Sequence, residues 1–379
     1  MRLTRSTPYN AAPDPHHFTH VTDSAAARPH FAIVRFSALG DVAMVMAAVQ
    51  ALHRAWPTAT LTWITSPLGY ALLNGMPGVN FVVLDKPRNW ADYLAFYRMF
   101  RQRRFDAVLA MQASLRINLL YPALRAPIKI GFDRARARDG QWLFCNRRIP
   151  FRDEHLLDSF LAFVTALTGA PAVAAWNLPL MASEHAWAGQ RLAALPRPLV
   201  ALHPFSSKAE RNWPAPRYAK LIELTVKFFD CGIVITGGAA PDETALCTRL
   251  AQIAPGHTLN LCGQTSPKQL AAVLAQAAVL VAPDTAAVHL ARAVETPVVG
   301  LYAVASARLT GPYQRTEYCV DHHADAVREL LGKDAGALPW NTRVHHPDAM
   351  TLIEVEEVME QLGRVLAARA GAIRGEETA

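Results

Sequence analysis

The chain has 379 residues, a formal net charge of +7 and a hydrophobic content of 51%. This length suits two medium-sized domains, and no apolar run approaches the roughly 20 residues of a transmembrane helix. Residues 1–30 are polar and lack the apolar segment of a signal peptide, so we expect a mobile extension there. The five scattered cysteines form no CxxC pair, which is typical of small buried side chains in a reduced compartment.

Apolar runs alternate with helical patterns along the chain, and the pattern runs twice. In the first half we predict strands at 31–36, 61–64, 81–84 and 105–110, and helices at 42–55 and 90–103. After a proline-containing segment, 178–198, we predict strands at 199–203, 232–236, 259–262, 279–281 and 298–301, with helices between them. This alternation predicts parallel sheets covered on both faces.

We therefore expect an α/β protein with two doubly wound domains, residues 31–185 and 197–349. A final amphipathic helix, residues 350–370, is expected to pack back on the first domain. Two such domains imply a cleft between the carboxyl ends of their strands, where ligands bind in this class of fold.

The segment from Ala282 to Ala291 reads APDTAAVHLA and follows a buried strand. It delivers an Asp and a Thr to a helix N-terminus, where free backbone N–H groups and the helix dipole favour an anion. His289 lies one turn further along the same helix. This pattern predicts a nucleotide-diphosphate site.

Four segments in order resemble glycosyltransferase family 9. They are Arg35–Asp41 (RFSALGD), Ser206–Pro214 (SSKAERNWP), Asp284–Ala291 (DTAAVHLA) and Thr310–Tyr313 (TGPY). The resemblance implies the GT-B architecture of two facing Rossmann-like domains. It also implies an inverting transfer from ADP-heptose that needs no catalytic metal or other cofactor.

The chain departs from the family pattern in two places. Ala286 replaces the usual glycine after Asp-Thr, and Tyr302–Ala305 replaces the usual Phe-Gly-Pro-Thr. Both positions are expected near the donor. These two departures leave open the alternatives that the donor is another nucleotide sugar, or that the acceptor is a protein or an O-antigen.

The resemblance assigns Asp41 as the general base that removes a proton from the acceptor hydroxyl; the alternative is a helix N-cap. Two members of the expected donor site keep alternatives, because His289 could be a core residue and Glu243 could only complement a helix dipole. The expected donor-binding residues are Ser206, Ser207, Lys208, Arg211, Glu243, Thr265, Asp284, Thr285, Ala286, Ala287 and His289.

Positive charge is concentrated between Arg98 and Arg152, with thirteen Lys and Arg against three acids. Such an excess favours a polyanionic partner. No zinc-finger, ribonucleoprotein or helix-turn-helix pattern accompanies it, so we expect lipid phosphate and an anionic membrane surface rather than nucleic acid. The predicted acceptor or anion patch is Arg101, Arg103, Arg104, Arg134, Arg136 and Arg138.

Together these features predict an inverting, metal-independent transferase that moves a heptose from ADP-heptose to a phosphorylated glycolipid of the lipopolysaccharide inner core. It would work in the cytoplasm, peripherally at the inner face of the cytoplasmic membrane. The competing hypothesis of another class is a catalytically silent nucleotide-sugar-binding protein. The sequence has no GxGxxG, P-loop or GxSxG motif, which argues against a dehydrogenase, a P-loop NTPase or a hydrolase.

Overall fold

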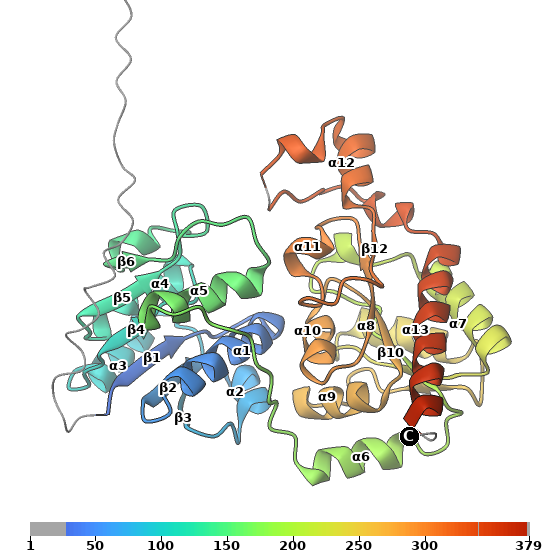
Figure 1. Cartoon of the computed structure of the whole chain (residues 1–379), viewed down its shortest axis with the longest axis horizontal. Coiled ribbons are helices and arrows are strands. Elements are labelled where there is room, and N and C mark those ends of the chain that lie inside the picture. Colours follow the sequence, from blue (N-terminus) through green and yellow to red (C-terminus); the bar gives the residue numbers. More distant parts are fainter. Residues whose placement is uncertain (1–27, 340, 377–379) are drawn as a thin grey trace, which may run out of the picture.

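Two parallel six-stranded sheets form the framework of the computed structural model, which describes residues 28–339 and 341–376 (Figure 1). The first sheet has the order β3-β2-β1-β4-β5-β6 and the second β12-β11-β10-β7-β8-β9. The first sheet contains β1 (His30–Val34), β2 (Thr60–Thr65), β3 (Val79–Val83), β4 (Ala107–Leu109), β5 (Ile128–Gly131) and β6 (Arg147–Arg148). The second contains β7 (Leu199–Leu202), β8 (Gly232–Ile235), β9 (Thr258–Asn260), β10 (Val279–Pro283), β11 (Val298–Tyr302) and β12 (Val320–Asp321).

Each domain thus has its first strand beside its fourth, which is the doubly wound order with a switch point between those two strands. The expected α/β fold of two doubly wound domains is confirmed. The central strands β1 and β10 are buried along almost their whole length, which explains their continuous apolar sequences. The predicted mobile extension lies outside the described residues, apart from positions 28–30.

Helices cover both sheets. The first domain carries α1 (Leu39–Ala55), α2 (Pro67–Leu73), α3 (Trp90–Phe100), α4 (Leu115–Asn118), α5 (Leu156–Thr168) and the 3₁₀ turns η2 (Tyr121–Ala123) and η3 (Gln141–Leu143). The rest of the chain carries α6 (Ala182–Leu192), α7 (Ala215–Phe229), α8 (Pro241–Ala251), α9 (Pro267–Gln276), α10 (Ala286–Ala293), α11 (Ala307–Thr310), α12 (His323–Leu331) and α13 (Val355–Glu376). Its 3₁₀ turns are η4 (Ala209–Arg211), η5 (Ala335–Ala337) and η6 (Ala349–Leu352).

Helix boundaries follow local chemistry. Helix α9 begins after Ser266, whose hydroxyl accepts the Gln269 N–H at 3.2 Å, and Pro267 occupies the first helical position. Helix α5 ends at Gly169, which has a φ of 76°, a backbone conformation that costs glycine little. Helix α6 lies in the expected linker and packs against α9.

The two domains are joined by an apolar core. One cluster of buried side chains extends from the first sheet through α1 and α10 to the second sheet. Helix α1 packs against both α5 and α10, so it lies between its own domain and the other (Figure 1). An apolar contact of this size fixes how the two switch points face each other.

The last helix differs from expectation. Helix α13 packs against α7, and Val358, Leu362 and Val365 belong to the core of the second domain. The expectation that this helix packs back on the first domain is wrong. Its amphipathic pattern predicts a buried face but does not identify the domain that covers it.

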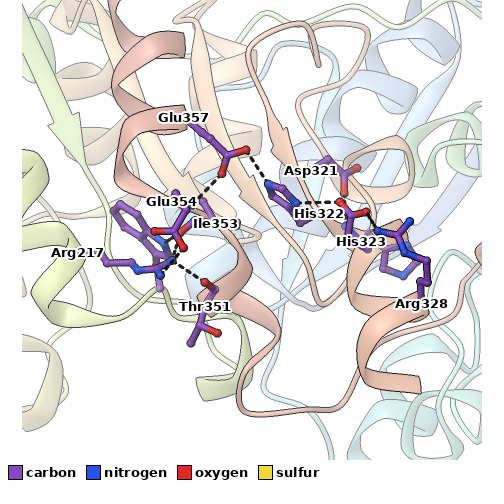
Figure 2. Close-up of polar contacts among 11 residues, drawn as sticks. Arg217, Asp321, His322, His323, Arg328, Thr351, Ile353, Glu354 and Glu357 are labelled. Atoms are coloured by element: carbon purple, nitrogen blue, oxygen red, sulfur yellow. Dashed lines mark hydrogen bonds and ion pairs between the residues drawn. The ribbon is translucent and has the colours of Figure 1, made fainter. Parts of the chain in front are cut away.

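Polar contacts hold α13 and α12 to the second domain (Figure 2). Arg217 of α7 pairs with Glu354 at 2.8 Å and donates to the Thr351 carbonyl at 2.7 Å. His322 lies between two carboxylates, 2.9 Å from Asp325 and 2.9 Å from Glu357. The imidazole therefore bridges the helix that it precedes, α12, to α13.

Candidate active site between the two switch points

The N-termini of α1 and α10 face each other across the domain boundary. A Cβ atom added at Gly40 would lie 2.7 Å from His289 Cδ2 and 3.3 Å from Ala286 Cα. Glycine is therefore required at position 40 for the backbone of α1 to come this close to α10. The approach brings Asp41, the next residue, to the second domain.

Asp41 occupies the first turn of α1 and accepts the Ala38 backbone N–H at 3.1 Å. Its carboxylate also pairs with Arg35, which donates to the Met111 carbonyl at 2.6 Å. The N-cap residue is Ala38, and Asp41 caps the helix from the N3 position, as the acidic member of a capping box. The same carboxylate is held between the ends of β1 and β4 by Arg35, and it acts electrostatically on His289 and Asp284.

Asp284 directly follows β10 and is buried, with 8% exposure. Arg211 Nη1 lies 2.9 Å from its carboxylate, and the Ser206 hydroxyl donates to its backbone carbonyl at 2.8 Å. Burial raises the pKa of Asp284, whereas Arg211 opposes this rise. These contacts join the loop after β7 to the loop after β10, at the switch point of the second domain.

Helix α10 begins at the same point. Thr285 is its N-cap residue, and Ala286 and Ala287 are its first two residues, whose N–H groups precede the intrahelical hydrogen-bond ladder. His289 is buried against Gly40, and this burial lowers its pKa to about 4, so the imidazole is neutral at pH 7. The two alternatives for His289 were a core residue and a diphosphate contact. Its position is compatible with both, because the side chain is buried and lies beside the expected diphosphate site.

Four more of the expected donor residues lie on the same edge of the second sheet. Ser207 and Lys208 are exposed in the loop after β7, and Thr265 precedes α9. Glu243, in the first turn of α8, accepts the Gly238 N–H at 2.6 Å and so closes its own loop. One of its carboxylate oxygens is therefore engaged in organising the loop after β8.

The predicted arginine patch does not form one surface. Arg136 is buried, with 9% exposure, and its guanidinium lies 2.7 Å from the Asp133 carboxylate. It therefore braces its own loop and is not part of an exposed patch. Arg134 and Arg138 are exposed on that loop.

The other three arginines of the patch, Arg101, Arg103 and Arg104, precede β4, and Arg104 bridges to Arg125 ahead of β5. They lie at the amino edge of the first sheet, whereas Asp41 lies at its carboxyl edge. The charge count could not distinguish these two edges, because residues just before and just after a short strand are close in sequence but lie at opposite ends of that strand.

The structure reveals a cationic hollow that sequence reasoning missed. A cavity of about 600 Å³ opens beside the carboxyl ends of β3 and β4. Lys86 contacts the Ser37 hydroxyl, in the loop that leads to Asp41. Burial lowers the pKa of Lys86, and Arg35 and Arg116 lower it further. The residues lining the cavity are Lys86, Pro87, Arg88, Tyr93, Ser114, Leu115, Arg116, Leu119 and Asp139.

A signal for this hollow was present in the sequence. Lys86 and Arg88 come directly after the predicted strand 81–84, where the rule for strand ends places ligand contacts.

The TGPY segment braces the cleft from the second domain. The Tyr313 hydroxyl donates to Asp158 at 2.6 Å, and the His155 imidazole donates to the Gly311 carbonyl at 3.0 Å. Arg308 pairs with Asp153 at 2.5 Å. These contacts hold α5 of the first domain against the chain around α11.

Neither a metal-binding cluster nor a membrane-spanning helix is found among the described residues. Within 28–339 and 341–376, no group of three His, Cys, Asp or Glu side chains is arranged to hold a metal ion. In the same part of the chain, no helix has both the length and the apolar character of a membrane span.

Comparison with known proteins identifies the family. The model of glycosyltransferase family 9 (heptosyltransferase) matches residues 93–333. A lipopolysaccharide core heptosyltransferase, OpsX of Haemophilus influenzae, is 31% identical over 88% of this chain and 96% of its own length. The chain belongs to glycosyltransferase family 9. It is therefore an enzyme of the heptosyltransferase type.

Solved structures share the fold. The glycosyltransferase family 9 protein of Veillonella parvula superposes with a TM-score of 0.73 at 16% identity, covering 90% of this chain and 97% of that one. The ADP-heptose lipopolysaccharide heptosyltransferase II of E. coli gives 0.69 at 19% identity, covering 90% and 99%. The family 9 enzyme thus has the GT-B arrangement that the sequence motifs implied.

Proposed function

We propose that this family 9 enzyme transfers a heptose from ADP-heptose to a phosphorylated glycolipid of the lipopolysaccharide inner core, with inversion and without a catalytic metal. The observation that carries the proposal is the approach of α1 to α10. It places Asp41 of the first domain opposite Asp284 and His289 of the second. The names of the relatives, a lipopolysaccharide core heptosyltransferase and an ADP-heptose enzyme, support the choice of donor and acceptor.

In the proposed reaction, Asp41 removes the proton from an acceptor hydroxyl as its oxygen attacks the anomeric carbon of the donor. The new glycosidic C–O bond forms while the bond from the sugar to the β-phosphate breaks. ADP leaves with the electron pair, and the proton stays on Asp41. Attack from the face opposite the leaving group inverts the anomeric centre.

The leaving diphosphate needs positive charge as this bond breaks. Arg211, Lys208 and the N–H groups of Ala286 and Ala287 supply it, together with the Thr285 hydroxyl. Asp284 binds sugar hydroxyls. Glu243 and Thr265 lie outward along the second sheet, on the side where the ribose and base would extend.

The acceptor approaches from the first domain. We assign its anionic groups to the hollow that contains Lys86, Arg88 and Arg116, because this hollow adjoins the Asp41 loop. Exposed Arg134 and Arg138 extend the same charge toward the cleft. The arginines at the amino edge, Arg101, Arg103 and Arg104, would then meet anionic lipids peripherally rather than the reacting sugar.

The donor is tested by thermal stabilisation with ADP, ADP-heptose, UDP, GDP and dTDP sugars, since a ligand stabilises in proportion to its occupancy. We expect a shift with ADP and ADP-heptose alone. A shift with a different nucleotide would replace the donor but keep the mechanism. A lack of any shift across this panel would contradict the proposed donor site.

The membrane role has its own test. Binding to anionic vesicles should weaken as salt rises from 0.05 to 0.5 M, about the range over which exposed charges become screened. Binding that does not depend on salt would contradict an electrostatic attachment.

A further inference from the structure

Residues 341–348, which precede η6, lie beyond residue 333, where the family match ends. Three of these residues are fixed by hydrogen bonds. The His323 imidazole donates to the Thr342 carbonyl at 3.1 Å, and the Val344 N–H donates to the Val304 carbonyl at 2.9 Å. His345 Nδ1 lies 2.9 Å from a Glu210 carboxylate oxygen.

These anchors hold Arg343 in one place. Val344 is fully buried in the core of the second domain, and its partner Val304 lies just past the end of β11. Arg343 is thereby set at the carboxyl edge of the second sheet. Strand β11 is the neighbour of β10, after which Asp284 stands.

Positive charge gathers at this point. Burial lowers the pKa of Arg343 most. The positive charges of Arg211 and, from the first domain, of Arg138 lower the pKa further. Asp284 and Glu210 act in the opposite direction. Glu210 is already paired with His345. Of the cations gathered here, Arg211 pairs with the buried carboxylate of Asp284, and Arg343 acts on that carboxylate electrostatically.

Two N–H groups of these arginines also lack a hydrogen-bond acceptor in the part of the chain that the structure describes. Among the described residues, Arg343 Nη1 and Arg211 Nε are buried without a hydrogen-bond partner. A buried unpaired donor on a cation is costly, and crowding of like charges adds to that cost. An anion with several oxygens between the two arginines would satisfy both groups and offset the repulsion.

We propose that Arg343 is a further donor-binding residue, whose guanidinium joins that of Arg211 in holding the diphosphate of the nucleotide sugar. Arg138 brings the first domain to the same anion, so donor binding and the closed cleft support each other. The proposal rests on the proposed function, because it needs a nucleoside diphosphate beside Asp284. It also supplies cationic stabilisation of the leaving group from the protein's own side chains.

The test measures the affinities of ADP, AMP and adenosine by calorimetry for wild type, Arg343→Ala and Arg343→Lys. Loss of a charged hydrogen bond should weaken ADP by about 10- to 100-fold, with a smaller loss for AMP and none for adenosine. Arg343→Lys should recover part of the ADP affinity. The matched control is Arg328→Ala on α12, an exposed arginine that pairs with Asp325 and Glu329; it should bind ADP as wild type does.

The possible failures are distinguishable. Wild-type ADP affinity in a folded Arg343→Ala variant would overturn the proposal but leave the proposed function intact. Unchanged ADP affinity with a raised KM for a phosphorylated acceptor would overturn it and assign Arg343 to the acceptor phosphate. A wild-type protein that binds none of ADP, UDP or GDP would overturn the proposed function and this inference together.

Discussion

The two domains share one strand order, yet their switch points carry different side chains. At the first, between β1 and β4, a carboxylate on a helix start is paired with Arg35 and adjoins a cationic hollow. At the second, between β7 and β10, Asp284 is buried beside Arg211. We therefore propose that the same backbone frame serves proton transfer at the first switch point and donor binding at the second.

The contrast indicates that the strand order determines where ligands bind, whereas the local side chains determine which chemistry occurs there. If the two switch points have these separate roles, changes at the first should alter turnover or acceptor KM. Changes at the second should alter donor affinity.

The largest effect should come from Asp41→Asn, which removes the proposed base without removing its volume. We expect turnover to fall by about 10³-fold, within the range for loss of a general base, with ADP affinity within twofold of wild type. The matched control is Glu184→Gln, which alters an acid that accepts a backbone N–H at the same position of α6. Turnover above a tenth of the wild-type value would remove Asp41 from the base role.

Gly40→Ala tests the contact between the two switch points. The added methyl meets His289 and the α10 backbone, so we expect a loss of about 1–3 kcal/mol of unfolding free energy. Turnover should fall by about 10- to 100-fold because Asp41 is displaced from the donor.

Adding His289→Ala should restore part of the stability lost in Gly40→Ala, since it removes the nearer of the two clashes. The control Gly189→Ala, on α6, meets only the Gln276 amide at 3.9 Å and should be tolerated. If Gly40→Ala matched that control in stability, the domains would not approach as described.

Lys86→Ala tests where the acceptor binds. We expect about a tenfold rise in acceptor KM, because a charged contact to the acceptor is lost, with ADP affinity unchanged. Arg101→Ala, at the amino edge of the same sheet, should leave both parameters unchanged with a soluble acceptor. The reverse pattern would return the acceptor to the patch that the charge count predicted.

The smallest effect concerns His322, between Asp325 and Glu357 (Figure 2). Burial lowers its pKa, but the hydrogen bonds to Glu357 and Asp325 raise the pKa overall. The stabilisation is therefore fully present below the ordinary value near 6.5 and is lost as pH rises through the raised folded value.

Because the group is half-exposed, His322→Gln should cost less than about 1 kcal/mol at pH 6 and still less at pH 8. Thermal melts over this pH range measure the difference. A cost that grew with pH would contradict the sign of the shift.

Much of the fold could be predicted from sequence. The strands at the centre of each sheet are continuous apolar runs. The predicted segments 31–36, 199–203 and 279–281 overlap β1, β7 and β10, respectively. Three short strands were missed: β5 has four residues, β6 is two exposed arginines, and β12 has only two residues. Such strands form by pairing with a neighbour rather than from a pattern of their own.

The site was predictable only where a residue follows a recognisable strand. Asp41 and Asp284 meet that condition, and the structure brings their switch points together. The proposed donor residue Arg343 does not, because it lies in an irregular segment 59 positions after Asp284 and is positioned by the tertiary hydrogen bonds of its neighbours Thr342 and Val344. The burial of Arg136 could not be predicted from the sequence either, because a count of charges does not show that Asp133 pairs with it.

The most direct test of the account is ADP release by the wild-type enzyme from ADP-heptose, measured with and without a lipopolysaccharide-core acceptor. We expect ADP to appear only when both substrates are present, in a one-to-one ratio with the heptosylated product. Donor binding with no release of ADP under either condition would contradict it, and would favour a nucleotide-sugar-binding protein that keeps the fold without the transfer.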